Sequence, residues 1–150
     1  MSGRLLFWPL LLALCLALGW QTLRLRSRLL ASQLVRQVEL ISLAAAPSGP
    51  AAMNQVLPVD LALLRRAAAA DPAAVEVPLA RAAQFMLVGR PQDAIASYLA
   101  AIELEPHPEI YLLLGRAQLE AGDPAAARRN FELAVRLDPS ARDVVPPGGL

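Results

Sequence analysis

The sequence predicts an all-α protein: one apolar N-terminal helix followed by a short array of helical hairpins. The first observation is an uncharged, largely apolar stretch over residues 5–23. At about 1.5 Å per residue, such a helix is long enough to cross the ~30 Å hydrocarbon core of a bilayer. The second observation is that apolar residues recur every three or four positions in the second half of the chain, between breaks that contain Gly and Pro. Together they predict a membrane-attached helical domain.

Residues 1–23 are interpreted as an uncleaved transmembrane anchor. Two tryptophans lie near the ends of the apolar stretch, where indole rings favour the headgroup level, and arginines follow it, where they can bind lipid phosphates. The residues assigned to the anchor and its flank are Leu5, Trp8, Leu12, Leu16, Trp20, Arg24 and Arg28. The alternative is a signal peptide cleaved after Gly19, because Ala17 and Gly19 have the spacing of a cleavage site.

The charge on either side of the anchor indicates its orientation. Arg4 precedes the apolar stretch, whereas Arg24, Arg26 and Arg28 follow it closely. Because basic residues stay on the cytoplasmic side, the sequence favours a single-pass protein with the following domain in the cytoplasm.

Residues 24–46 are predicted to continue as an amphipathic helical neck. One stripe is apolar and consists of Leu30, Leu34, Val38 and Ile41. This neck would lie on lipid or pack on the following domain, or would make a coiled-coil-like contact with a membrane partner. Residues 47–58 begin with Pro47-Ser48-Gly49-Pro50 and are predicted to be a linker.

The clearest hairpin is centred on Gly122-Asp123-Pro124. Gly suits the left-handed end of one helix, Asp the N-cap of the next and Pro its first position. On both sides of this break, apolar and small residues recur at helical spacing. Small residues at 115 and 127 would let the two helices approach closely.

At these positions the sequence resembles the tetratricopeptide repeat, a unit of about 34 residues with an aromatic residue, Leu-Gly, Ala, an aromatic residue, Ala and Pro at set offsets. The matching residues are Tyr111, Leu114, Gly115, Ala127, Phe131, Ala134 and Pro139. A second copy carries Ala94, Tyr98 and Ala101 at the corresponding positions.

The resemblance implies about two and a half repeats over residues 59–139: a partial repeat at 59–73, then 75–106 and 108–139. The first helix of the middle repeat departs from the pattern, because Pro78 replaces the aromatic residue and Arg81-Ala82 replaces Leu-Gly. We expect that helix to begin at Pro78 or to bend in its first turn. Residues 140–150 are predicted to be a disordered tail. The missing C-terminal cap predicts an exposed apolar strip of Phe131, Leu133, Val135 and Leu137 that would favour self-association.

The composition argues against catalysis, cofactors, metals and nucleic acid. Cys15 is the only cysteine, and His107, the only histidine, lies in a Pro-flanked turn that we expect to be exposed. Glu103, Glu105 and Glu109 have no spacing that forms a paired-carboxylate site. Residues 47–150 hold nine arginines against twelve acids, and this net negative charge disfavours nucleic-acid binding.

Protein binding remains. In the repeat family, the first helix of each hairpin lines a concave groove that takes peptides or partner helices. By register, the predicted groove residues are Glu76, Leu79, Ala83, Met86, Leu87, Glu109, Leu112, Arg116, Leu119 and Glu120. This set is mostly apolar and lacks the lysines and asparagines that clamp a terminal carboxylate in chaperone-binding members. It therefore favours an apolar helix or loop of another protein. The leucines of this set also fit a purely structural role in the core.

The layout resembles bacterial inner-membrane repeat proteins that assist assembly of envelope complexes. It implies a non-enzymatic, membrane-anchored adaptor that recruits protein partners. The alternatives are an accessory subunit held in a membrane complex through its transmembrane helix, and a secreted repeat protein.

Overall fold

The computed structural model describes the backbone of residues 3–150 and the side chains of residues 13–150. Its elements are α1 (Gly3–Ala45), the 3-10 turn η1 (Ala46–Ser48), α2 (Pro50–Ala70), α3 (Glu76–Leu87), α4 (Pro91–Leu104), α5 (Pro108–Glu120), α6 (Pro124–Leu137) and the 3-10 turn η2 (Pro139–Val144). No strand occurs within residues 3–150, and the predicted all-α fold is confirmed.

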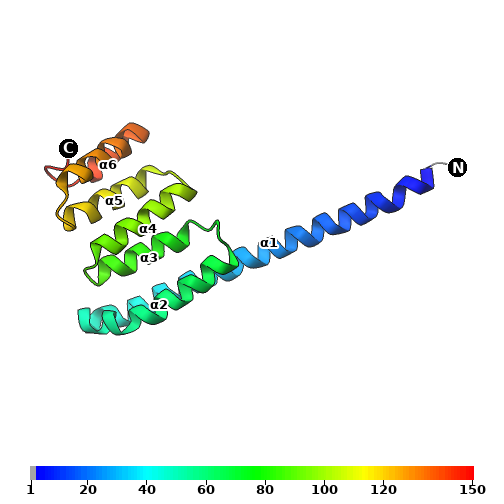
Figure 1. Ribbon diagram of the computed structural model, residues 1–150, viewed down its shortest axis with the longest axis horizontal. Coiled ribbons are helices and arrows are strands. Elements are labelled where there is room, and N and C mark those ends of the chain that lie inside the picture. Colours follow the sequence, from blue (N-terminus) through cyan, green and yellow to red (C-terminus); the bar gives the residue numbers. More distant parts are fainter. Residues whose placement is uncertain (1–2) are drawn as a thin grey trace.

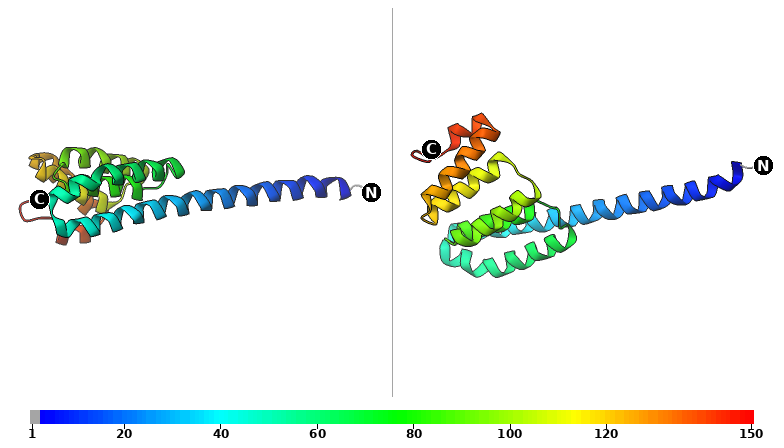
Figure 2. Two further views of the ribbon diagram at one scale, coloured as in Figure 1. Left: turned by 90° about the horizontal axis from the view of Figure 1, so that it is seen from below. Right: turned by 45° about the horizontal axis from the view of Figure 1, so that its top comes forward.

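The helices form a stack of antiparallel hairpins from which the N-terminal part of α1 projects (Figure 1). α3 pairs with α4 and α5 pairs with α6, as the repeat resemblance predicted. The C-terminal part of α1 lies along α2 in all three ribbon views (Figure 2). The array is therefore three hairpins long.

This first hairpin corrects the expected linker and completes the partial repeat. α2 begins at Pro50, so residues 50–58 are helical rather than a loop. Only η1 and Gly49 separate α1 from α2. Gly49 has a φ of 85°, a conformation that glycine adopts with little strain. Pro50 takes the first position of α2, where its missing N–H has no partner to lose. Pro58 lies inside α2, with its ring on the exposed side.

The neck packs on the repeats rather than lying free. Ala31, Val35 and Val38 of α1 are buried against Leu64 and Ala67 of α2, in a core that also includes Val77 of α3. Of the predicted apolar stripe, Val38 is fully buried and Leu30 is exposed. Residues from about 31 onward in α1 thus act as the first helix of the first hairpin.

The first helix of the middle repeat begins two residues before Pro78, within the predicted bounds of 75–106. α3 begins at Glu76, and Pro78 lies in its first turn, where N–H groups lack intrahelical acceptors. Ala82 replaces the usual Gly without disrupting the packing, because it is small enough to be fully buried in the core that α3 forms with α4 and α5.

The repeat signature forms the core of the last two hairpins. The signature residues that are buried are Ala94, Tyr98, Ala101, Leu114, Gly115, Ala127, Phe131 and Ala134; Tyr111 is half-buried, and Pro139 is exposed at the start of η2. A Cβ on Gly115 would lie 2.5 Å from Cε1 of Phe131. This position therefore admits only glycine while the ring keeps its place.

The C-terminal segment is ordered over the last hairpin, contrary to the expected disordered tail. η2 begins with Pro139, and the carboxylate of Asp138 caps it by accepting from the Ser140 N–H at 2.9 Å. Ala141 is buried against α5 and α6. The predicted exposed strip is therefore wrong except at Leu137, which is 53% exposed, because Phe131 is fully buried and Leu133 and Val135 are half-buried.

Candidate protein-binding surface

The projecting part of α1 is covered by no other part of the described chain. Leu14, Leu16, Leu18 and Leu23 are exposed, with Leu16 at 67%. One helix of the described residues, over Ala13–Ser48, is long and apolar enough to cross a membrane, a criterion that a signal sequence also meets. The side chains of the predicted anchor residues Leu5, Trp8 and Leu12 lie outside the described residues.

The basic flank of α1 bridges the projecting segment and the repeats. The guanidinium of Arg24 lies 5.3 Å from the ring centroid of Trp20, a cation–π contact that joins two predicted interfacial residues. One turn later, Nε of Arg28 lies 4.0 Å from Oδ2 of Asp71 in the α2–α3 loop. Ala31 is where α1 begins to pack on the repeats. At about 1.5 Å per residue, it lies about 16 Å along the helix from Trp20.

Most of the predicted groove residues are accessible. On α3, Glu76, Ala83 and Leu87 are exposed, while Leu79 and Met86 are half-buried against the core between α3 and α5. Each of these two side chains therefore packs partly against the core and remains partly accessible. The resulting surface on α3 is apolar, with a single acid at its N-terminal end.

On α5, the structure divides the predicted groove residues. Glu109, Arg116, Leu119 and Glu120 are exposed, with Leu119 at 36%. Leu112 is 8% exposed and belongs to the core with Ala127, Phe131 and Ala141. Leu112 therefore packs against η2 through Ala141, and it also lines the pocket that remains between α5 and η2.

η2 also takes up part of the surface beside α5. Nη2 of Arg116 donates to the carbonyl of Val144 at 3.1 Å. A shallow pocket remains there, lined on one side by α5 and on the other by η2. The surface on α3 is thus the more open half of the predicted groove.

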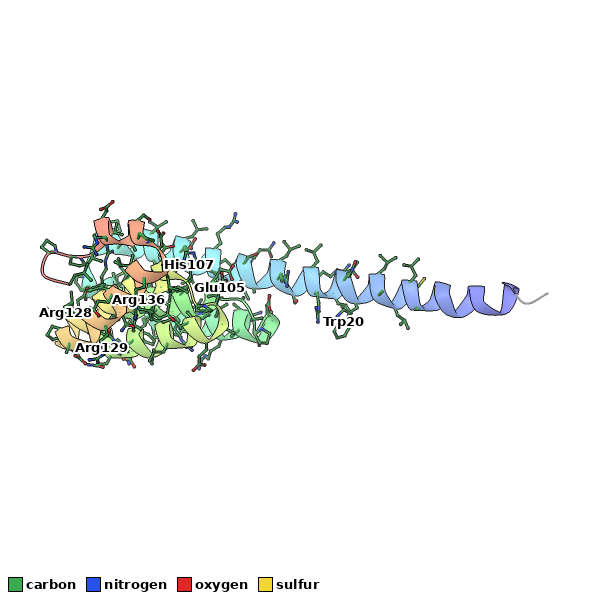
Figure 3. The ribbon with its side chains drawn as sticks, turned by 90° about the horizontal axis from the view of Figure 1, so that it is seen from above. Trp20, Glu105, His107, Arg128, Arg129 and Arg136 are labelled. Atoms are coloured by element: carbon green, nitrogen blue, oxygen red, sulfur yellow. The ribbon has the colours of Figure 1, made fainter. Side chains whose placement is uncertain are left out.

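The turn before α5 holds its histidine as a helix cap. His107 is exposed, and its Nδ1 accepts from the Glu109 N–H at 3.4 Å. Figure 3 shows His107 and Glu105 at the end of the array nearer the projecting part of α1, with Arg128 and Arg129 at the opposite end. Among the described residues, no group of three metal-capable side chains gathers.

A buried polar cluster between α1, α2 and α3 was not predicted from the sequence. The hydroxyl of Ser42 lies 3.0 Å from Oε1 of Gln84 and 3.4 Å from Oδ2 of Asp60. All three side chains are buried, and Oδ1 of Asp60 has no hydrogen-bond partner within the described residues. Burial raises the pKa of Asp60 above its ordinary value of 3.8, an effect that the Ser42 hydrogen bond opposes. The hint available in the sequence was Asp60, which falls at helical spacing among the buried apolar residues Leu57, Leu64 and Ala67 of α2.

Comparison with known proteins agrees with this architecture. A family model described as tetratricopeptide repeat matches residues 88–142, from just after α3 into η2. The crystal structure of a thermophilic TPR protein in Thermus thermophilus matches with a TM-score of 0.56 at 21% identity, covering 73% of this chain and 66% of that chain, just under two-thirds of its length. No curated protein matches the sequence. Tetratricopeptide repeats are typically non-enzymatic interaction modules. Residues 88–142 therefore match the tetratricopeptide repeat, and the helical array of this chain has the fold of a tetratricopeptide-repeat protein.

Proposed function

We propose that the chain is a membrane-anchored adaptor whose repeats bind protein partners and assist the assembly or stability of a membrane complex. The observation that carries this proposal is the continuity of α1, a single helix of 43 residues. Its projecting part is apolar and uncovered, and its other part is packed as the first helix of the array. Anchor and binding domain thus share one rigid element.

The exposed leucines of α1 support a membrane setting. A helix whose apolar side chains face outward all round is stable when lipid covers it, since its backbone hydrogen bonds are satisfied internally. Trp20 and Arg24, in contact at 5.3 Å, would then lie at the headgroup level. The repeats would be held close to the surface of a bacterial inner membrane.

The proposed orientation places the repeats in the cytoplasm, because Arg24, Arg26 and Arg28 outnumber Arg4 across the span. Paired reporters fused after Leu150, one active only in the cytoplasm and one only outside it, measure this directly. Activity of the external reporter would contradict the orientation and move the partner search to the envelope. An N-terminus found by mass spectrometry at Trp20 would show cleavage and exclude an anchor.

The adaptor surface is proposed to be the concave face of α3, where Ala83 and Leu87 are exposed. A photo-crosslinking amino acid at Ala83, in the full chain in native membranes, should give a discrete adduct with another protein. The same probe at Arg128, exposed on α6, is the matched control and should not. Adducts that form equally at both positions would contradict a defined groove.

An accessory subunit held by its transmembrane helix is the second candidate, supported by the uncovered leucines of α1. Replacing residues 5–23 with an unrelated apolar span discriminates the two. An adaptor should keep its Ala83 adduct, because the contact lies in the repeats. An accessory subunit should lose association with the complex, with adducts arising only from probes at positions such as Leu16.

A further inference from the structure

A pocket lies between α2 and the repeat that follows it, away from the concave groove. Its volume is about 460 Å³, within the range of roughly 300–1,000 Å³ typical of ligand sites. The apolar side chains that line it are Leu57, Pro58, Leu61, Leu64, Ala68, Val77 and Phe85. The remaining lining residues are three arginines, Arg65, Arg81 and Arg90, and no acidic residue lines the pocket.

The helical geometry of α3 separates this pocket from the predicted groove. Arg81 and Phe85 lie within about 40° of each other around the helix axis, whereas Ala83 lies about 200° from Arg81. Nε of Arg81 donates to Ser97 of α4 at 3.1 Å, which places Arg81 on the side of α3 that faces the second helices of the hairpins. A ligand in the pocket and a partner in the groove would thus contact opposite faces of α3.

Two of the three guanidinium groups are held in place by the protein. Arg81 is fixed through its bond to the buried Ser97. Arg90 lies 5.0 Å from the ring centroid of Phe85 and pairs with Asp93 at 2.7 Å. Within residues 13–150, Arg65 forms no ion pair. Positive charge that is already positioned over an apolar floor costs little ordering when an anion binds.

We propose that this pocket binds a short acidic peptide segment of another protein, with an apolar side chain seated on Leu61 and Phe85 and neighbouring carboxylates paired with the arginines. Guanidinium groups bind carboxylates with two parallel hydrogen bonds, and the partial desolvation of such a pocket strengthens them. The lining supplies both complements of this ligand: apolar area and two arginines, Arg65 and Arg81, that form no ion pair within residues 13–150.

The position of Arg90 in the pocket favours a peptide over an anionic lipid of the anchoring membrane. Arg90 lies in the α3–α4 turn, at the end of the array opposite to the projecting part of α1 (Figure 1). Headgroups beside Trp20 would therefore face the other end of the domain. A flexible segment of a bound protein can reach this end.

The test uses the full chain in phosphatidylcholine nanodiscs and a phage library of random ten-residue peptides. We expect enrichment of peptides that combine acidic with aliphatic or aromatic residues. The variant Arg65→Gln/Arg81→Gln/Arg90→Gln should weaken binding of the enriched peptide by at least about tenfold, since each charge-assisted contact contributes on that scale. Binding should also weaken as salt is raised.

The matched control is Arg128→Gln/Arg129→Gln/Arg136→Gln, which makes the same charge change on the exposed surface of α6 (Figure 3) and should leave binding unchanged. The single variant Arg65→Gln keeps the test independent of folding, because Arg65 is exposed and unpaired among the described residues; it should weaken binding several-fold.

Absence of an acidic consensus, or equal loss of binding in the two triple variants, would overturn the proposal. Arginine-dependent binding of soluble dihexanoylphosphatidylglycerol without peptide enrichment would also overturn it and assign the pocket to a lipid headgroup. The adaptor proposal is tested by adducts at Ala83 on the opposite face, so the two proposals fail separately.

Discussion

The first and last hairpins have the same architecture but are packed by different means. In the last hairpin, α5 and α6 meet where the ring of Phe131 lies against Gly115, and small alanines surround the contact. In the first hairpin, α1 and α2 meet through Ala31, Val38 and Leu64 without a glycine or an aromatic residue. The family signature is thus one solution to close helix packing, and a stripe of Ala and aliphatic residues on longer helices is another.

The two hairpins also shift the pKa of an acidic side chain in opposite directions. Asp60 of α2 is fully buried, and burial raises its pKa. Asp138, at the end of α6, accepts from both the hydroxyl and the N–H of Ser140, which lowers its pKa. The first hairpin therefore carries an acid whose ionisation opposes folding, and the last carries one whose ionisation supports it.

The largest effect should come from the aromatic core of the last hairpin. Phe131→Ala removes a fully buried ring and should lower the free energy of unfolding by about 3–5 kcal/mol. Chemical denaturation of the full chain in detergent, followed by circular dichroism, measures this loss. Leu137→Ala, on the same helix but at a side chain that is 53% exposed, is the control and should change stability little. Equal effects at the two positions would contradict the packing described here.

The buried acid of the first hairpin should give the next largest effect, with the opposite sign. Asp60→Asn keeps the shape and removes a carboxylate charge whose burial is unfavourable, so stability at neutral pH should rise by about 1–3 kcal/mol. Because the folded pKa is raised, the unfolded chain ionises first as pH rises past 3.8, and the wild-type protein loses stability until the folded pKa is passed.

The gain of Asp60→Asn should therefore vanish below about pH 4 and grow above it. Unfolding curves at a series of pH values test this dependence. A gain that is the same at every pH would show that the carboxyl group is not the cause.

A smaller loss should follow from Ser42→Ala. It removes the hydroxyl that joins α1 to Gln84 of α3 at 3.0 Å and should cost about 1 kcal/mol. Ser32→Ala on the same helix removes an exposed hydroxyl that bonds only to its own helix, at Leu29, and is the matched control. If both variants unfolded at the same denaturant concentration as the wild type, the polar cluster would contribute nothing to joining the anchor helix to the repeats.

The last two hairpins were predictable because their turn residues and small residues each favour one local backbone conformation or one close helix contact. Gly122-Asp123-Pro124 forms the turn expected of it: Gly122 has a φ of 82°, and Asp123 caps α6 by accepting from the Ala126 N–H at 2.9 Å. Gly115 was identified as a point of close helix approach, and the ring of Phe131 lies against it. Each of these residue types favours a single structural role at its position, so the sequence pattern predicts the hairpin.

The start of α2 and the C-terminal turn were missed because proline occurs both in loops and in the first turn of a helix. Pro50 was interpreted as a loop residue and Pro139 as the end of the ordered array, yet each starts a helical turn, where proline is favoured. The sequence left open whether Leu112 lies in the groove or in the core, and the turn that covers it, η2, was expected to be disordered. The structure at these positions depends on packing between segments that are distant in the sequence, which the local spacing of residues does not reveal.

The smallest effect should come from the acid of the last hairpin, and its sign should oppose that of Asp60. Asp138→Asn removes a charge that Ser140 stabilises, so stability should fall slightly at neutral pH. Because the folded pKa is lowered, this contribution is complete above the ordinary value of 3.8 and is lost as pH falls toward the folded pKa. Asn can still cap η2, which keeps the loss small.

The same pH series therefore separates the two ends of the array. Going from acid to neutral pH, Asp60→Asn should gain stability relative to the wild type and Asp138→Asn should lose it. The double variant should show the sum of the two effects, because the residues lie in different hairpins that share no partner. Changes of the same sign in both single variants would mean that the two carboxyl groups have similar environments, which contradicts the contrast between a buried acid without a partner for Oδ1 and a surface acid held by Ser140.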